Sequence, residues 1–158
     1  MKNHINNYLP CDIILIQRPI RSLDLIPLAI QIGTLCRWNH LGLAISDKEI
    51  IHSHGKDKTG KSGVSIDFID SIEGRKLILR YKDLTRPEKK RILFHALKQK
   101  GKKFNWWTFF GKSDTEKNKL SCQDIVNDSF SFAGIELNYW RPRDFLYDDR
   151  FITIKGGE

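Results

Sequence analysis

Cysteine is scarce in this sequence, whose 158 residues include only Cys11, Cys36 and Cys122. So few cysteines at such irregular spacing exclude a disulfide framework, and they exclude a zinc site built from paired Cys-x-x-Cys ligands. We therefore predict reduced thiols, as in an intracellular protein, and we predict no metal or other cofactor.

Long apolar segments are missing as well. The most apolar stretch, residues 23–35, is interrupted by Asp24, Pro27 and Gln31 and is shorter than the ~20 residues that cross a bilayer, so we expect a packed helix over residues 22–32. Residues 1–7 lack the charged and then apolar pattern of a secretory signal. These absences predict a cytoplasmic protein, or one that is exported without such a signal.

Acidic residues are outnumbered by basic ones, which gives a formal net charge of +8. Such a chain is attracted to polyanions, including nucleic acid, anionic lipid and acidic wall polymers, although a basic solvated surface explains the charge equally well. Basic residues near Trp106 and Trp107 are one way to grip single-stranded nucleic acid, but this pattern is more typical of a core turn with solvated lysines. We keep an anionic surface as a candidate partner and do not expect nucleic acid. The sequence indicates no oligomeric state.

Composition and length predict one folded domain over residues 1–158, because 40% of the residues are hydrophobic and 29% are charged. Apolar runs and alternation predict strands over residues 12–17, 40–45, 49–54, 63–67, 76–81 and 151–155. The helix signals described next complete an α+β fold.

A capping box at Thr85-Arg86-Pro87-Glu88 begins a helix that we expect to reach Gly101. Its predicted core-facing residues are Ile92, Leu93, Ala96 and Leu97. A later helix is predicted from residues 120–122 to Gly134, with Ile125, Val126, Phe130 and Ala133 as its apolar side.

Cys122 lies in the first turn of this later helix, where unpaired backbone N–H groups and the helix dipole stabilise an anion. This position favours a lowered thiol pKa and a reactive thiolate, and the same N–H groups can hold an oxyanion. The alternative is a buried structural cysteine, since free cysteine is one of the most buried residue types.

His40 begins a strand in which it shares one face with the small residues Gly42 and Ala44. A face of small residues lets a helix approach closely, so we expect it to lie against the start of the Cys122 helix. The sulfur would then lie roughly 3 to 4.5 Å from an imidazole nitrogen of His40. A lone histidine in an apolar strand is otherwise a satisfied core residue. Together, Cys122 and His40 fit a thiol nucleophile and its base.

A third residue should orient the base, and the candidates are His52 and His54 on the returning strand. A turn with an odd number of residues places both on the face of His40, whereas a two-residue turn places His52 on the opposite face. If residues 46–48 are the loop, His54 is directly across from His40 and His52 is diagonal to it. The strand pattern leaves both candidates open.

These residues resemble the permuted NlpC-type papain-like superfamily, and they are nearest to the YaeF/YiiX-type amidases, with lecithin retinol acyltransferase-like proteins as relatives. The resemblance covers most of the chain. It rests on segments 39–45, 50–53, 63–64 and 121–126, on Cys11-Asp12 before the first strand, on Gly101 with Phe104-Asn105, and on Pro142-Arg143-Asp144-Phe145. Cys11 stands where the family usually has glycine, and Phe104-Asn105 stands where it has Tyr-Asp.

The resemblance implies a circularly permuted papain-like fold, in which an antiparallel sheet packs against helices. It implies Cys122 as nucleophile and His40 as base, and the family's spacing of twelve residues favours His52 over His54 as the third residue. The implied activity is cleavage of an amide, such as a peptidoglycan-type or isopeptide bond, through a thioester. Hydrolysis or transfer of a lipid or other acyl ester is one alternative. A non-catalytic binding module of the same fold is another.

Overall fold

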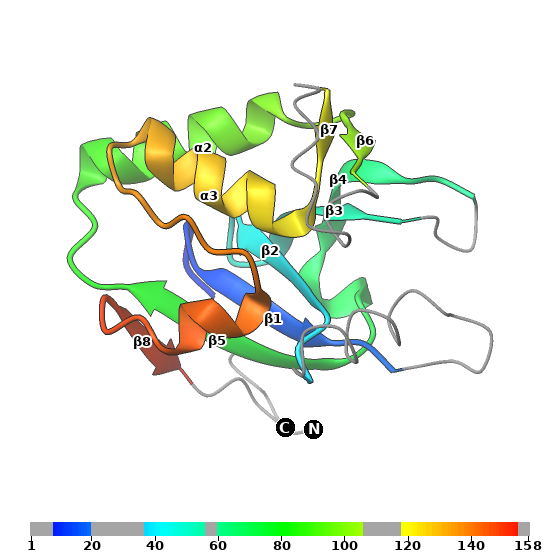
Figure 1. Cartoon of the computed structure of the whole chain (residues 1–158), viewed down its shortest axis with the longest axis horizontal. Coiled ribbons are helices and arrows are strands. Elements are labelled where there is room, and N and C mark those ends of the chain that lie inside the picture. The colour runs from blue at the N-terminus through cyan, green and yellow to red at the C-terminus, as the bar shows by residue number, and fades with distance from the viewer. Residues whose placement is uncertain (1–7, 20–36, 56–59, 106–117, 155–158) are drawn as a thin grey trace.

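Six antiparallel strands form the central sheet of the protein in a computed structural model (Figure 1). The structure describes residues 8–19, 37–55, 60–105 and 118–154. The order across the sheet is β4-β3-β2-β1-β5-β8. The strands are β1 (Ile13–Gln17), β2 (His40–Ala44), β3 (Glu49–His54), β4 (Gly63–Phe68), β5 (Arg75–Tyr81) and β8 (Phe151–Ile154). Each predicted strand is confirmed to within one residue at either end. The predicted helix over residues 22–32, Cys36 and the Trp106-Trp107 pair lie outside the described residues.

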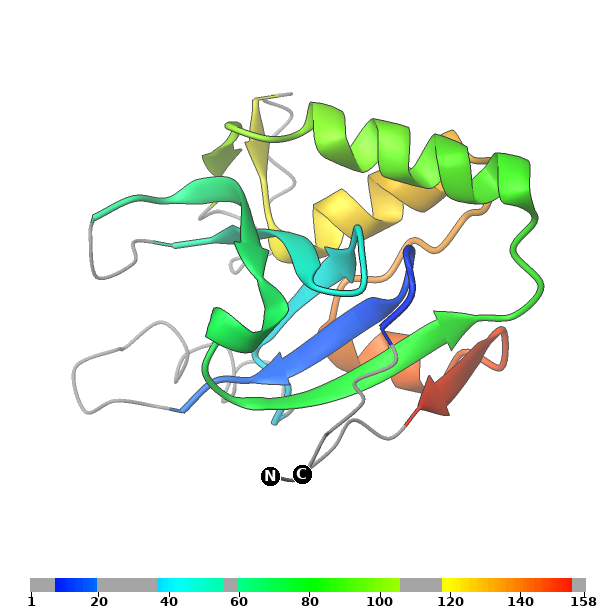
Figure 2. The same cartoon turned by 180° about the vertical axis from the view of Figure 1, so that it is seen from behind.

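Two helices, α2 (Arg86–Lys98) and α3 (Cys122–Phe132), cover one face of the sheet in the described part of the chain (Figure 1, Figure 2). Each begins with a capping box, one formed by Thr85 and Glu88 and the other by Ser121 and Asp124. In both boxes two backbone N–H groups that the helix leaves unpaired find side-chain acceptors. These elements confirm the predicted α+β class.

The core lies between these helices and the sheet. Leu41 and Leu43 of β2 pack there with Ile125, Val126 and Phe130 of α3. The predicted apolar side of α3 is thus confirmed, because it provides the face that the sheet buries.

The prediction for α2 is confirmed for Ile92 and Ala96, which are buried, but it is wrong for Leu97, which is 45% exposed. The buried stripe of α2 continues from Ala96 to Gln99. Leu97 is turned about 100° around the helix from Ala96 and therefore faces solvent.

A short parallel ladder leads directly to α3. It pairs β6 (Lys103–Phe104) with β7 (Lys119–Leu120). Gly63 at the start of β4 lies against this region with φ +114, and a Cβ there would be 2.3 Å from the carbonyl oxygen of Lys102. Only glycine fits such an approach, which lets the Val64 N–H donate to the same carbonyl at 2.8 Å.

The opposite face of the sheet carries a second apolar cluster that includes Ile14, Ile50 and Ile78. Two 3-10 segments complete the described chain, η1 (Ile69–Ser71) after β4 and η3 (Pro142–Leu146) before β8. Within the described residues, no helix is both long and apolar enough to cross a membrane.

Asp12 forms a buried ion pair beside β1 and supports a stability prediction. Its carboxylate is 1% exposed and accepts two hydrogen bonds from Arg80, each at 2.8 Å. We expect Asp12→Ala to lower the free energy of unfolding by about 3 kcal/mol, because it removes the buried acceptor of two charge-assisted hydrogen bonds from Arg80. Urea titration measures the change. The exposed Asp47→Ala is the matched control, and an equal loss in both variants would contradict the prediction.

Candidate active site

The turn between β2 and β3 determines which histidines share a face. The Ile45 N–H donates to the Glu49 carbonyl at 2.9 Å, so residues 46–48 form the loop. The register pairs Leu43 with Ile51 and Ala44 with Ile50. This loop has an odd number of residues, and His40 therefore shares a face with His52 and His54.

His52 is the residue that contacts His40. The Nε2 atom of His40 lies 2.7 Å from Nδ1 of His52, and both side chains are buried. The ring centroids are 4.9 Å apart at 75°. His54 instead directs its Nδ1 to the Gly55 carbonyl at 2.7 Å. The strand pattern left His52 and His54 open as the third residue. His52, which is diagonal to His40, is the one placed to orient it.

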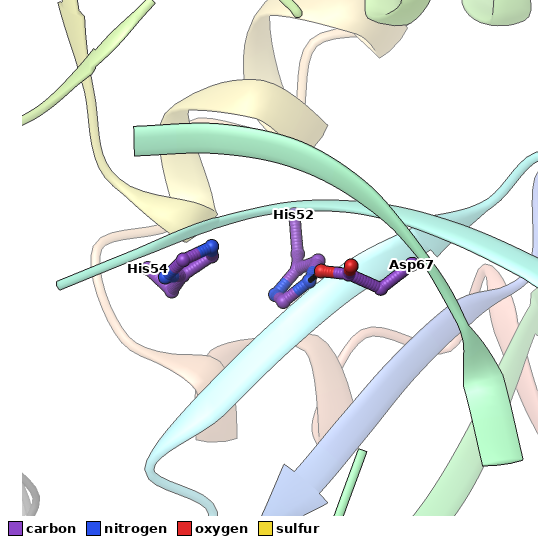
Figure 3. A group of neighbouring side chains, drawn as sticks. All are labelled: His52, His54 and Asp67. Carbon is purple, nitrogen blue, oxygen red and sulfur yellow. Dashed lines mark hydrogen bonds and ion pairs between the residues drawn. The ribbon is translucent and has the colours of Figure 1, made fainter. Parts of the chain in front are cut away.

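Asp67 is the next residue in the chain of hydrogen bonds that starts at His40 and His52, and it was missed by the sequence analysis. Its Oδ2 lies 2.7 Å from Nε2 of His52 (Figure 3). The same oxygen accepts a hydrogen bond of 2.7 Å from the Ser65 hydroxyl. Ser65 lies opposite His52, and Asp67 lies two residues further along β4 on the same face. The alternation of residues 63–68 contained the signal, because Ser65 and Asp67 are the polar positions of that strand.

The hydrogen bonds that link His40, His52 and Asp67 determine which nitrogen of each ring carries the proton. A carboxylate only accepts, so Asp67 requires N–H at Nε2 of His52, whose Nδ1 then accepts from Nε2–H of His40. The Nδ1 atom of His40 is left with a lone pair, as a base needs. Burial and then the positive charge of Arg18 lower the pKa of His40 well below its ordinary value. Burial also lowers the pKa of His52, against the opposing effect of the hydrogen bond that His52 donates to Asp67. Both rings are neutral.

Asp67 is ionised in this arrangement. The hydrogen bond from His52, followed by that from Ser65, holds the pKa of Asp67 below its ordinary value against its partial burial. The carboxylate can therefore keep the His52 tautomer across the whole neutral range of pH.

Cys122 is the first residue of α3 and is buried. Its thiol donates to Oε1 of Gln123 at 3.1 Å. Burial raises the pKa of Cys122 to about 11, while the backbone N–H of Leu41 acts in the opposite direction. The expectation of a lowered pKa is therefore wrong for this state, because removal of the sulfur from water outweighs the helix start. The resting site holds a thiol and a neutral imidazole.

The predicted packing of the small face of β2 is also wrong. Gly42 lies against Ile50 and His52, and Ala44 belongs to the apolar cluster on the face away from the helices. The α3 helix instead packs on Leu41 and Leu43. Cys122 belongs to the same core cluster as Leu41, which follows His40 in the chain, and the backbone N–H of Leu41 acts to lower the pKa of the Cys122 thiol. No hydrogen bond among the described residues joins Cys122 to His40.

No family model matches the chain, and no curated protein matches it. The chemistry of the site must be inferred from its own groups, which are a buried thiol at a helix start, two linked imidazoles and a carboxylate.

The other cysteine that the structure describes lies apart from these groups. Cys11 is buried ahead of β1, and its thiol donates to the Lys89 carbonyl at 3.6 Å. Burial raises its pKa to about 12. Cys122 is therefore the candidate nucleophile among the two described thiols.

The buried thiol predicts a particular pH dependence of alkylation. Below a pKa of about 11 the thiolate fraction of Cys122 grows with pH, so the rate of its reaction with iodoacetamide should rise about tenfold per pH unit between pH 7 and 9. Peptide mapping separates Cys122 from Cys11, which should react more slowly throughout. A rate that is already constant at pH 7 would show a preformed thiolate and contradict the prediction.

Gly42 provides a test of the packing around His52. A Cβ at this position would lie 2.6 Å from Cδ1 of Ile50 and 2.9 Å from Cβ of His52. We expect Gly42→Ala to cost about 1 to 3 kcal/mol in urea unfolding and to lower activity, because His52 must move away from His40.

A double variant separates these two effects. Adding Ile50→Val removes Cδ1, the nearest of three clashing atoms, and leaves Cγ1 of residue 50 at 2.8 Å and Cβ of His52 at 2.9 Å. Gly42→Ala/Ile50→Val should therefore recover part of the stability and none of the activity. Ile50→Val alone is the control. Full recovery of activity in the double variant would show that His52 is not displaced.

Proposed function

We propose that this chain is a cysteine acyl hydrolase of circularly permuted papain-like fold that cleaves an amide bond. The observation that carries the proposal is the position of β2 between both halves of the site. His40 of β2 begins the hydrogen-bonded chain through buried His52 to the partly exposed Asp67. The next residue, Leu41, belongs to the same core cluster as Cys122, and its backbone N–H acts to lower the pKa of that thiol.

The proposed reaction uses a neutral base and a neutral thiol. Nδ1 of His40 takes the proton of Cys122 as the sulfur attacks the substrate carbonyl carbon. The carbonyl oxygen becomes an oxyanion, for which the backbone N–H of Cys122 at the start of α3 is a donor. The intermediate collapses to a thioester, and the amine leaves with the proton from His40. A water molecule, deprotonated by the same ring, then attacks the thioester and frees the acid and the thiol.

The series behind His40 supports this reaction. As His40 becomes an imidazolium, its Nε2–H donates more strongly to His52, which is itself polarised by the Asp67 carboxylate. The rings need no reorientation, because both hydrogen bonds are already 2.7 Å long. Such preorganisation favours the charged state that forms only during turnover.

Two further features support the permuted papain-like assignment. Cys11, where the family usually has glycine, has a φ of 75, a backbone conformation that favours glycine. The Phe104-Asn105 segment, which resembles the family's Tyr-Asp, lies beside the strand that leads to the nucleophile, and the Asn105 N–H donates to the Leu120 carbonyl at 3.1 Å.

Activity profiling tests the proposal. The full chain and its Cys122→Ala variant are incubated with peptidoglycan fragments, ubiquitin-like isopeptide conjugates and phospholipids, and the products are identified by mass spectrometry. We expect cleavage of an amide by the unmodified chain and none by the variant. Equal products from both proteins, or no product from any of the three classes, would count against a cysteine hydrolase, and the latter would favour a binding module.

A lipid ester is the second candidate substrate, and one surface favours it. Phe94 and Phe132 are each 52% exposed on the outer side of α2 and α3, and Lys90 and Arg91 line the same shallow hollow. The ammonium group of Lys98 lies 4.3 Å from the centroid of the Phe94 ring. Aromatic rings among basic groups suit an anionic lipid surface. Release of fatty acid in the phospholipid arm would establish this alternative.

A further inference from the structure

Three metal-binding side chains meet on the face of β3 and β4. His52, His54 and Asp67 each offer one donor atom, and these atoms all lie within 4.8 Å of one another. Figure 3 shows the carboxylate of Asp67 directed at the ring of His52, with the ring of His54 beside them. The sequence analysis predicted no metal because it relied on paired cysteines, and it assigned these histidines only to orienting His40.

Where His54, Ser65 and Asp67 meet, there are fewer hydrogen-bond donors than acceptors. His54 donates from Nδ1 to the Gly55 carbonyl, and in this tautomer Nε2 carries a lone pair. Nε2 lies 3.1 Å from the hydroxyl of Ser65, whose only proton goes to the Asp67 carboxylate at 2.7 Å. Lone pairs of His54, Ser65 and Asp67 thus face one another, and a cation placed among them would satisfy all three.

We propose that His52, His54 and Asp67 form a binding site for a divalent metal ion of the zinc class. Two imidazoles and one carboxylate suit zinc, and water can supply the fourth ligand because Asp67 is 43% exposed. The hydrogen bond from His54 to a backbone carbonyl is the outer contact that typically fixes a metal-binding histidine.

Only small movements are needed to form this site. Donor atoms around a tetrahedral zinc ion are separated by about 3.3 Å, as follows from metal–ligand distances of about 2.0 to 2.1 Å. Nε2 of His52 and Oδ2 of Asp67, now 2.7 Å apart, would therefore separate slightly, and Nε2 of His54 would move inward. The Ser65 hydroxyl stays beside the carboxylate and can continue to donate to it.

Metal binding would prevent His40 from accepting the Cys122 proton, a consequence that rests on the proposed function. Nε2 of His52 carries a proton in the resting site, so zinc can bind this nitrogen only when that proton moves to Nδ1 of the same ring. His52 then donates to Nε2 of His40, and the His40 proton moves from Nε2 to Nδ1. Both rings keep one proton each, but Nδ1 of His40 no longer has a lone pair for the Cys122 thiol. The site is therefore an inhibitory one.

Metal binding is tested first in the Cys122→Ala chain, which removes the thiol as a competing ligand. Calorimetric titration with Zn²⁺ should show one tight site, and Co²⁺ should give tetrahedral visible bands without a thiolate charge-transfer band. Adding His54→Ala or Asp67→Asn should weaken Zn²⁺ binding at least about tenfold. Adding His95→Ala, a half-buried histidine of α2, is the control and should not change it. Unchanged affinity in the His54→Ala and Asp67→Asn chains would overturn the proposed site, as would a thiolate band.

Inhibition is tested separately, on the active chain and a substrate that it is found to cleave. Zn²⁺ should inhibit reversibly, with recovery on addition of a chelator. The His54→Ala variant, compared with its own metal-free rate, should need at least about tenfold more Zn²⁺ for half-inhibition. Equal sensitivity of both proteins would overturn the inhibitory role. Because the binding titration uses an inactive chain, its result does not depend on whether the proposed function is correct.

Discussion

Replacement of Cys122 by serine is expected to lower kcat by at least about a thousandfold, the scale of losses when a covalent nucleophile is removed. The hydroxyl is a far weaker nucleophile than the thiol, and His40 cannot compensate because its pKa is already lowered by burial. Cys11→Ser and Cys36→Ser should leave kcat within a few-fold. The measurement is the initial rate on the substrate found by activity profiling.

Thermal unfolding provides the control for this comparison. Serine is close in size to cysteine, so Cys122→Ser should unfold within a few degrees of the unmodified chain. Equal losses of activity in all three serine variants would sink the assignment of Cys122 as the nucleophile. They would indicate instead that the thiols act through stability.

Substitutions at His40, His52 and Asp67 are expected to lower activity by progressively smaller factors, in that order. His40→Ala should lower kcat/KM by about a hundredfold to ten-thousandfold, the usual contribution of a general base. His52→Asn should retain measurable activity, since its amide oxygen can accept the hydrogen bond from Nε2 of His40. Asp67→Asn should cost the least, about tenfold, because it acts on the base only through His52.

The pH profile distinguishes these roles from simple loss of structure. Because burial lowers the pKa of His40 below 6.5, the ring stays unprotonated in mild acid, and kcat/KM should begin to fall only below that pH. A larger loss from His54→Ala than from His52→Ala would contradict the arrangement. It would show that the residue across from His40 in the extended register, and not the diagonal one, supports the base.

Several elements were predictable because their signals are local. The capping boxes at Thr85 and Ser121 begin their helices within one turn of sequence, and residues 63–68 show the alternation of a half-buried strand. These properties depend on neighbours only a few residues away. The strand pattern left two possible faces for His52, and the three-residue loop of the structure decided between them.

The packing of β2 could not be predicted in the same way. Small residues such as Gly42 and Ala44 indicate a close approach, but they do not say what approaches. The sequence suggested a helix, whereas the fold brings Ile50 and His52 of the neighbouring strand against Gly42. Burial of Cys122 was likewise decided by packing, and it reversed the expected direction of the thiol pKa.

By itself, the sequence determined the strands and the helix starts, because each depends on local backbone geometry. The tertiary structure alone decided that β4 lies beside β3, which brings Asp67 to His52 and Ser65 to His54. Contacts between strands depend on which edges meet, and many strand orders suit the same alternation. The carboxylate that fixes the tautomer of the proposed base and the donor set of the proposed metal site both arise from that one placement.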